Sequence, residues 1–319
     1  MILIAPDKFK GTFTAEEICR MVCKRLRDFG IVERICCRPL SDGGEGVASV
    51  FMPEGKKISE GVYEHNGHRL VVTSEIIGFS AFSGKNIPLM HRSSVNLGRA
   101  IVPGIPTTVA VGGTAVSDAG AGFLQGLGVK FYNGSGDEIQ EPLCPDTLKN
   151  VMSADLSALN QYHLCGIIDV KAGLTEGSLT ALDFAPQKAL PGENIAGLAE
   201  CLRHFQRVLG GKSQWDGAGG GVGYALASVC GARCYSGAEA AVMSLDIDWD
   251  KVRLVITGEG RVDAQTVRGG KLVDAISREA SLRKIPTLIL YGAADDTNLY
   301  PLMARINSPW EKIVSSFLV

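Results

Sequence analysis

Residues 254–263 constrain the fold of this chain more than any other stretch of its sequence. Apolar or β-branched residues, Leu254-Val255-Ile256-Thr257, run directly into Gly258-Glu259-Gly260. A short apolar run bounded by glycine is typical of a buried strand in an α/β sheet. Ligands of such sheets bind outside the carboxyl ends of the strands, so Glu259, Arg261 and Asp263 are candidate site residues. The alternative is an ordinary strand–loop–helix corner whose charges face solvent.

The same order of strand, glycines and carboxylate occurs twice more. Asp42-Gly43-Gly44-Glu45-Gly46 follows the strand-like residues 34–38. Residues 112–122, which begin with Gly112-Gly113 and include Asp118, follow the strand-like residues 107–111. Because glycine has no side chain, another group can approach the backbone closely at these loops. Three such loops in one chain predict a site for a polyanion that also needs a metal ion.

The two ends of the chain share a strand–helix pattern that the middle lacks. A strand at residues 1–5 precedes a helix that Thr14 and Glu17 begin with a capping box, and the next strand reaches about residue 38. Strand, helix and strand return over residues 252–291, and Ser308-Pro309-Trp310-Glu311 predicts the capped start of a last helix.

We therefore predict an α/β fold with two domains. A Rossmann-like domain with a parallel sheet would comprise residues 1–55 and 245–319, and a mixed α/β domain, residues 56–244, would be inserted in it. Two consecutive domains remain the alternative. In the middle region, Asn66-Gly67 predicts a hairpin turn. Strands are expected at residues 69–77, 107–111, 129–132 and 163–169, and helices near residue 120 and at 195–209.

Composition excludes several classes of protein. The net charge is −2 and no Lys/Arg-rich run occurs, which argues against nucleic-acid binding. No apolar run approaches the length of a membrane span, so we expect a cytoplasmic protein that does not bind membranes. The nine cysteines include no Cys-x-x-Cys pair and are expected to be reduced thiols rather than zinc ligands. The sequence leaves the oligomeric state open, with a homodimer as one expectation.

Three familiar motifs fail on their spacing. Gly211-Lys212-Ser213 imitates a P-loop, but the required earlier glycine would fall at Gln206. Residues 217–223 are glycine-rich without the dinucleotide-binding spacing, which weakens the alternative of a hydroxyacid dehydrogenase. No Gly-x-Ser-x-Gly elbow occurs, and His91 is the only histidine beside a polar cluster.

Glycine loops, carboxylates and isolated basic residues remain, and phosphoryl transfer uses that combination. The basic residues are Lys10, Lys188, Arg261 and Lys271. The charge of a transferred phosphoryl group is stabilised by backbone N–H groups, Mg²⁺ and basic side chains. Mg²⁺ keeps several waters and needs only one or two protein carboxylates. We therefore expect dependence on Mg²⁺ and no tightly bound zinc.

The chain resembles the bacterial glycerate kinase family nearly from end to end. Six blocks in the family order carry the resemblance: residues 4–11, 40–46, 112–128, 186–188, 217–223 and 256–266. The resemblance implies ATP and D-glycerate as substrates, Mg²⁺, and a two-domain fold with the site between the domains. It favours 2-phosphoglycerate as the product.

Some positions depart from the family pattern. Lys8 stands where serine is usual, and Val116-Ser117-Asp118-Ala119-Gly120 stands for Thr-Asn-Asp-Gly-Gly. These departures leave two alternatives open: a catalytically silent ligand-binding or regulatory homologue, and a kinase for a related hydroxyacid.

The predicted site divides into roles. A hydroxyacid carboxylate needs a fixed cation; Arg261 is the first candidate and Arg268 the second. Asp263 is the predicted base. The predicted catalytic residues are Asp263, Lys10 and Asp42, and the substrate-binding residues are Arg261, Arg268 and Asp7. Nucleotide or phosphate contacts are expected from Gly43, Gly44, Gly112, Gly113, Gly219, Gly220 and Lys188, and metal contacts from Asp42, Asp118 and Glu259. The alternative for any of these aspartates is a helix cap.

Overall fold

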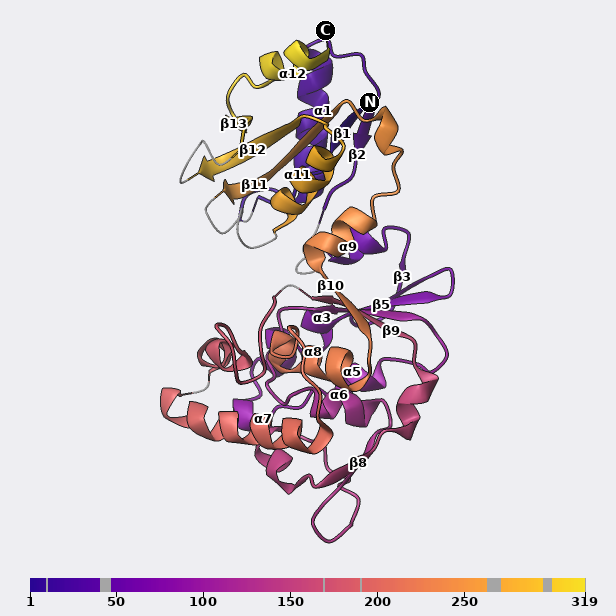
Figure 1. Cartoon of the computed structure of the whole chain (residues 1–319), viewed down its shortest axis with the longest axis vertical. Helices are drawn as coiled ribbons and strands as arrows, with labels where there is room; N and C mark the ends of the chain where they lie inside the picture. Colours follow the sequence, from indigo (N-terminus) through magenta and orange to yellow (C-terminus); the bar gives the residue numbers. More distant parts are fainter. Residues whose placement is uncertain are drawn as a thin grey trace. The chain divides into compact units, whose positions relative to one another are not determined.

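The chain forms two compact units (Figure 1). Unit 1 comprises Met1–Asp42 and Gly237–Val319, and unit 2 comprises Gly43–Ser236. The structure, a computed structural model, describes residues 1–9, 11–40, 47–168, 170–189, 191–262, 271–294 and 300–318. Helix α2 (Val47–Phe51) belongs to unit 2, and helix α9 (Gly237–Met243) belongs to unit 1. The predicted boundaries at residues 55 and 245 would have assigned each of these two helices to the other unit.

Unit 1 is built on a parallel sheet with the strand order β13-β12-β11-β1-β2. Its strands are β1 (Ile2–Ile4), β2 (Ile35–Cys37), β11 (Leu254–Val262), β12 (Thr287–Ala294) and β13 (Met303–Arg305). The central pair β1 and β11 is aligned from Ile2 opposite Leu254 to Ile4 opposite Ile256. Both segments are continuous apolar runs because both faces of a parallel sheet are covered.

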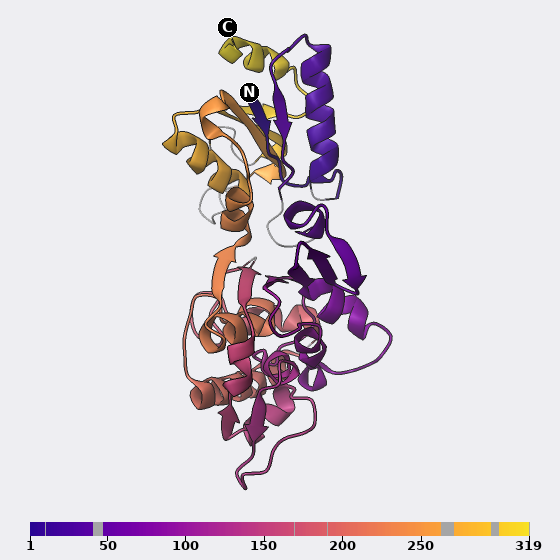
Figure 2. The same ribbon diagram turned by 90° about the vertical axis from the view of Figure 1, so that its right-hand side faces the viewer.

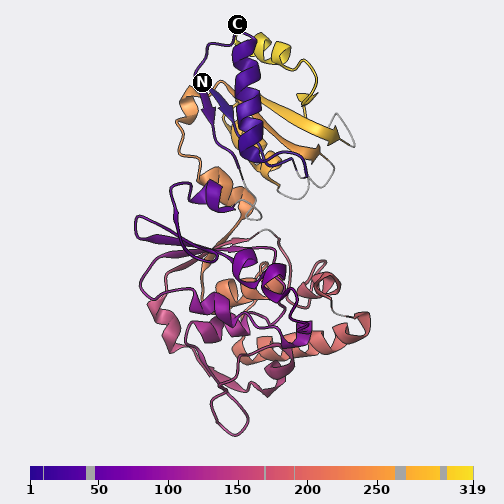
Figure 3. The same ribbon diagram turned by 180° about the vertical axis from the view of Figure 1, so that it is seen from behind.

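Helices cover the two faces of this sheet. Figure 2 shows α1 (Ala15–Asp28) on one side of the sheet and α11 (Leu272–Leu282) on the other, and Figure 3 shows α1 in front of the strands. Helix α1 and helix α12 (Glu311–Leu318) share one apolar core with β1, while Val273 of α11 packs with Val262 and Ile289. A short 3-10 helix, η9 (Trp249–Lys251), precedes β11.

The helix starts of unit 1 were predicted with mixed success. The capping box of α1 is confirmed, since Thr14 Oγ1 accepts from Glu17 N at 3.2 Å and Thr14 N donates to Glu17 Oε2 at 2.9 Å. Helix α12 begins at Glu311, and the Glu311 carboxylate forms an ion pair with Arg25. The predicted start at Ser308 differs from the structure: α12 begins at Glu311, so Trp310 precedes its first residue, and the Ser308 hydroxyl donates to Arg305 O.

Unit 2 contains a mixed sheet with the strand order β10-β9-β6-β5-β4-β3. Its strands are β3 (Lys56–Ser59), β4 (Val62–His65), β5 (His68–Val72), β6 (Thr107–Val111), β9 (Leu164–Ile168) and β10 (Arg233–Ser236). The four strands from β10 to β5 are parallel, and β4 and β3 continue the sheet in antiparallel pairing. A separate antiparallel pair joins β7 (Lys130–Tyr132) and β8 (Ser153–Asp155).

The sequence predicted one strand over residues 69–77, but the structure has a strand followed by a helix there. Strand β5 ends at Val72, and helix α3 (Thr73–Ile77) follows at once. Apolar periodicity alone does not distinguish a buried strand from a short buried helix. The predicted hairpin is confirmed: Asn66 and Gly67 join β4 to β5 with φ values of 49° and 74°. Positive φ at both turn residues is the geometry that Asn-Gly favours.

The remaining helices of unit 2 surround the sheet unequally. The larger core lies on one face and contains Val109, Phe123, Phe205 and Tyr224, whereas α2 covers the other face over Leu70 and Val72. The α-helices are α4 (Phe79–Phe82), α5 (Val95–Arg99), α6 (Ala121–Gly126), α7 (Ile195–Leu209) and α8 (Val222–Tyr224). Short helical turns are η1 (Leu89–His91), η2 (Pro145–Asn150), η3 (Ser157–Gln161), η4 (Ala181–Phe184), η5 (Pro186–Lys188), η6 (Gly192–Asn194), η7 (Ala218–Gly220) and η8 (Ala225–Val229).

Together, the parallel sheet of unit 1 and the mixed sheet of unit 2 confirm the predicted α/β fold class. All nine cysteines lie in the described part of the chain, and each is a free thiol, as expected. Within the same described residues, no helix is both long and apolar enough to cross a membrane.

Candidate functional site

Each unit presents candidate functional groups at the carboxyl ends of its own parallel strands. In unit 1 these groups follow β1 and lie on the last part of β11. In unit 2 they follow β5 and β6, which are neighbours in the sheet. Parallel strands place their carboxyl ends at one edge, which is where α/β sheets bind ligands.

In unit 1, the backbone brings Asp7 beside β11. Asp7 N donates to Gly258 O at 2.9 Å, and the Thr257 hydroxyl donates to Ala5 O at 2.6 Å. Lys8 N donates to Asp7 Oδ1 at 2.7 Å, which orients the carboxylate. Two predicted site residues, Asp7 and Glu259, therefore lie at the same edge of adjacent strands.

Glu259 is the more enclosed of the charged residues on β11. Its side chain is 12 % exposed, and Lys271 Nζ lies 3.8 Å from Glu259 Oε2. Burial raises the pKa of the Tyr300 hydroxyl, and the negative charges of Asp274 and Glu259 raise it further, so Tyr300 stays neutral near this edge. Arg261, two residues further along β11, is exposed. This edge combines carboxylates with basic side chains, as phosphoryl transfer requires.

In unit 2, Asp118 lies inside the glycine loop, which we define as residues 112–122. Its side chain is fully buried. Asp118 Oδ2 accepts from Ser94 N and Ser94 Oγ, both at 2.7 Å, and from Gly122 N at 3.3 Å, while Oδ1 accepts from Gly120 N at 3.1 Å. Burial raises the pKa of Asp118, and these hydrogen bonds oppose the rise. Because both oxygens are enclosed by donors, we propose that Asp118 shapes the loop rather than binding the predicted metal.

Replacing Asp118 with asparagine tests this structural role. The amide group would place a donor among groups that are all donors, so we expect unfolding to become easier by about 1–3 kcal/mol. Chemical denaturation measures the change, with Asp137→Asn, an exposed aspartate of unit 2, as the matched control. A variant that keeps wild-type stability but needs much more Mg²⁺ for activity would instead support the metal role.

Lys188 also serves the glycine loop. Its side chain is buried, and its Nζ donates to Val116 O at 2.6 Å, with Thr114 Oγ1 at 3.4 Å and Ser117 Oγ at 3.5 Å. Arg92 secures both segments by donating to Ala115 O at 3.1 Å and Lys188 O at 3.2 Å. Lys188 was predicted to contact phosphate. In the structure its ammonium group bonds to atoms of the glycine loop.

The second glycine-rich segment packs directly on the first. A Cβ atom at Gly220 would lie 2.0 Å from Val116 O, and one at Gly221 would lie 2.2 Å from Ala119 Cα. Ala119 N donates to Gly220 O at 3.1 Å. Gly220 and Gly221, both with positive φ, are therefore required for close contact between two backbones, whereas a Cβ atom at Gly219 would meet the Val111 side chain at 2.6 Å. The packing of backbones accounts for Gly220 without the predicted phosphate contact.

Gly112 and Gly113 occupy a different position, at the end of β6. The Thr73 hydroxyl donates to Gly112 O at 2.8 Å and accepts from Gly112 N at 3.0 Å. A Cβ atom at Gly113 would lie 2.9 Å from Ser74 Cβ, and its φ is +61°. This turn therefore joins the carboxyl ends of β5 and β6 tightly.

Six of the predicted site residues cannot be placed, because they lie outside the described residues. They are Lys10, Asp42, Gly43, Gly44, Asp263 and Arg268. Among the residues that are described, no group of three His, Cys, Asp or Glu side chains could hold a metal ion. Mg²⁺ needs fewer protein ligands, because substrate phosphates and water complete its shell. Asp7 and Glu259 fit that smaller requirement by their chemistry and their shared edge, whereas the enclosed Asp118 does not.

One polar cluster in unit 2 was missed by the sequence reasoning. Tyr63 Oη donates to the Glu75 carboxylate at 2.9 and 3.1 Å, and Lys57 Nζ pairs with Glu75 Oε2 at 2.9 Å. Residues 53–66 have a weak pattern, so the strand that carries Tyr63 was not predicted. The available signal was Glu75, an acid placed shortly after the end of a buried strand.

Comparison with known proteins agrees with this architecture. A crystal structure of a provisionally assigned glycerate kinase 2 from Salmonella typhimurium LT2 shares the fold with a TM-score of 0.80. It is 24 % identical, and the match covers 99 % of this chain and 94 % of that one. A protein of Escherichia coli K12 named glycerate 2-kinase is 26 % identical over 92 % of this chain and 86 % of its own. A glycerate kinase of Bacillus cereus is 29 % identical over 92 % and 85 %.

The α/β fold, together with the matches to proteins named glycerate kinase, defines an enzyme of the kinase class, which phosphorylates a hydroxyl acceptor. The sequence profile of the glycerate kinase family matches residues 2–308. The chain belongs to the glycerate kinase family, and the predicted resemblance is confirmed.

Proposed function

We propose that this protein is an ATP- and Mg²⁺-dependent glycerate kinase that converts D-glycerate to phosphoglycerate, with 2-phosphoglycerate as the favoured product. The family match over residues 2–308 carries the proposal. The carboxylates and basic residues at the edge of unit 1 support it. The relative from Escherichia coli that is named glycerate 2-kinase supports the choice of product.

In this reaction, an oxygen of the glycerate hydroxyl forms a bond to the γ-phosphorus of ATP. The bond between that phosphorus and the β–γ bridging oxygen breaks, and ADP leaves with the electron pair. The hydroxyl proton passes to a base, for which we propose Asp263. Mg²⁺, when bound, would neutralise charge on the phosphates, with Asp7 and Glu259 as proposed ligands. On the sequence alone, we propose catalytic roles for Lys10 and Asp42 and phosphate contacts for Gly43 and Gly44.

Arg261 is the proposed anchor of the substrate carboxylate. A guanidinium group binds a carboxylate through two parallel hydrogen bonds, which an ammonium group cannot reproduce. Arg261 is exposed on the last part of β11, two residues along the same strand from Glu259.

Replacing Arg261 with lysine is expected to raise the KM for D-glycerate about 10-fold, because one charge-assisted hydrogen bond of about 1.5–3 kcal/mol is lost. Steady-state kinetics with saturating ATP measure the change. Arg253→Lys, which changes the exposed residue just before the same strand, is the matched control and should leave KM unchanged. If Arg261→Lys behaves like Arg253→Lys, Arg261 is not the anchor.

A panel assay separates the proposed function from its alternatives. The purified protein is given ATP, Mg²⁺ and one of D-glycerate, L-glycerate or another small 2-hydroxyacid, and ADP release is coupled to NADH oxidation. The proposal expects the highest kcat/KM with D-glycerate and no activity after Mg²⁺ is removed. A higher value with another acid would identify a kinase for that acid. If the protein neither hydrolyses ATP nor transfers its γ-phosphate to any of these acids, it is the catalytically silent homologue.

A further inference from the structure

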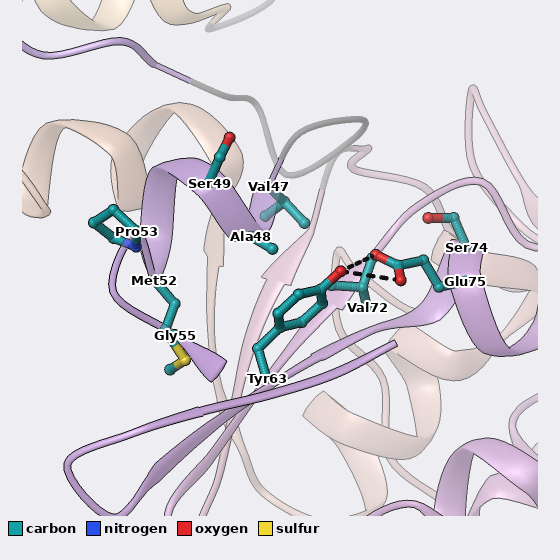
Figure 4. Close-up of a pocket in the computed structure, with 10 residues that line it drawn as sticks. All are labelled: Val47, Ala48, Ser49, Met52, Pro53, Gly55, Tyr63, Val72, Ser74 and Glu75. Carbon is teal, nitrogen blue, oxygen red and sulfur yellow. Dashed lines mark hydrogen bonds between the residues drawn. The ribbon is translucent and has the colours of Figure 1, made fainter. Parts of the chain in front are cut away.

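A pocket in unit 2 lies between helix α2 and the sheet face that α2 covers (Figure 4). Its cavity volume is about 460 Å³, within the usual range for small-molecule sites. Val47, Ala48 and Met52 line it from α2 and the residue after α2, and Val72 lines it from the end of β5. Among the described residues that line it, none is a site residue predicted from the sequence.

The pocket walls suit a flat, uncharged ring. Val47, Met52 and Val72 provide apolar surface, and the ring of Tyr63 adds a planar aromatic wall. Aromatic and apolar walls with few polar groups are typical of sites for planar ligands. Besides the hydroxyls of Ser49 and Ser74, Figure 4 shows the Glu75 carboxylate at one side of the pocket. This carboxylate would repel an anionic hydroxyacid.

Glu75 is held rigidly as an acceptor. It accepts from the Tyr63 hydroxyl at 2.9 and 3.1 Å and pairs with Lys57 at 2.9 Å, and its side chain remains 28 % exposed. Burial raises the pKa of Tyr63, and its hydrogen bond to Glu75 raises it further, so Tyr63 remains a neutral donor. An ionised carboxylate has about four acceptor positions, so Glu75 can accept further hydrogen bonds from a ligand amine.

The position of the pocket connects it to the proposed phosphate region. Ser74 lines the pocket, and it is also the side chain that a Cβ atom at Gly113 would meet at 2.9 Å. Its neighbour Thr73 binds both the N–H and the carbonyl of Gly112. A ligand with its ring in the pocket could therefore extend its polar end along the Gly112-Gly113 turn.

We propose that this pocket binds the adenine base of ATP, with Glu75 accepting a hydrogen bond from the exocyclic amine and the phosphates directed toward Gly112-Gly113. The inference rests on the proposed function, because it assigns the donor subsite of that kinase. Adenine matches the pocket through its planar shape, its lack of charge and its amine.

Filling the pocket tests the proposal. Ala48→Trp adds a ring to the lining on α2 and should raise the KM for ATP at least about 10-fold while the KM for D-glycerate stays within about 2-fold. Titration calorimetry with adenosine should show binding to the wild-type protein and none to the variant. Met152→Trp, at an exposed apolar position of unit 2, is the matched control. An unchanged KM for ATP in a folded Ala48→Trp protein would overturn the proposal.

A second measurement uses the wild-type protein and does not depend on how the variant folds. Purine riboside triphosphate, which lacks the exocyclic amine, should have a KM about 10-fold above that of ATP, since one charge-assisted hydrogen bond is lost. Equal KM values would contradict the role of Glu75. If the wild-type protein phosphorylates no hydroxyacid, the proposed function fails, and adenosine calorimetry still reports on the pocket.

Discussion

Replacing Asp263 with asparagine is expected to lower kcat about 10²–10⁴-fold, because removal of a general base typically costs that much. The residue follows Val262, the last residue of β11, and itself lies outside the described residues. The variant should keep its melting temperature and its response to Mg²⁺. Steady-state kinetics, thermal unfolding and Mg²⁺ titration on the same preparation measure the three properties.

The control for this variant is Asp246→Asn, which changes an exposed aspartate of unit 1 in the same way. It should leave kcat unchanged. A lower melting temperature with intact kcat in Asp263→Asn would show a structural residue, such as a helix cap worth about 1 kcal/mol. A shift in the Mg²⁺ requirement alone would instead assign Asp263 to the metal.

Replacing Gly220 with alanine is expected to destabilise unit 2 by about 3 kcal/mol or more. The added Cβ would lie 2.0 Å from Val116 O, and the backbone φ of +71° is strained for alanine. Either the glycine loop or η7 must then move, so any activity that depends on Gly112-Gly113 should fall as well. Chemical denaturation and ATP kinetics measure both effects.

Gly231→Ala is the matched control, because Gly231 has a similar φ of +65° and no atom within 4 Å of the position that an added Cβ would take. It should cost only about 1–2 kcal/mol, the penalty of the left-handed backbone itself. Equal losses in the two variants would show that the contact between the two glycine segments contributes nothing.

Four strands of the unit 1 sheet, β1, β2, β11 and β12, were predicted because each has a local signal, whereas β13 was not predicted. Residues 254–257 form a continuous apolar run, and Thr14 and Glu17 mark the start of α1. The segment of residues 69–77 was misread because its apolar residues suit a strand and a buried helix alike. In the structure, strand β5 ends at Val72 and helix α3 begins at Thr73. The Thr73 hydroxyl bonds to Gly112, a residue distant in sequence, and a local pattern does not reveal such a contact.

The candidate site was only partly predictable, for a physical reason. A glycine that approaches a phosphate and a glycine that approaches another backbone have the same sequence signature. Gly220 and Gly221 pack on the backbone of the glycine loop, and that partner is distant in sequence. Likewise, nothing local distinguishes Asp118, whose oxygens are enclosed by Ser94 and loop amides, from an aspartate that binds a metal. Glu75 and Tyr63 come together only through the pairing of β4 and β5.

The most direct test of the central claim is ³¹P NMR of the purified protein with ATP, Mg²⁺ and D-glycerate. We predict that the γ-phosphate resonance is lost only when D-glycerate is present, and that an equal amount of 2-phosphoglycerate appears. Retention of the γ-phosphate, or its release only as inorganic phosphate at a rate that D-glycerate does not change, would contradict the claim that this protein is a glycerate kinase.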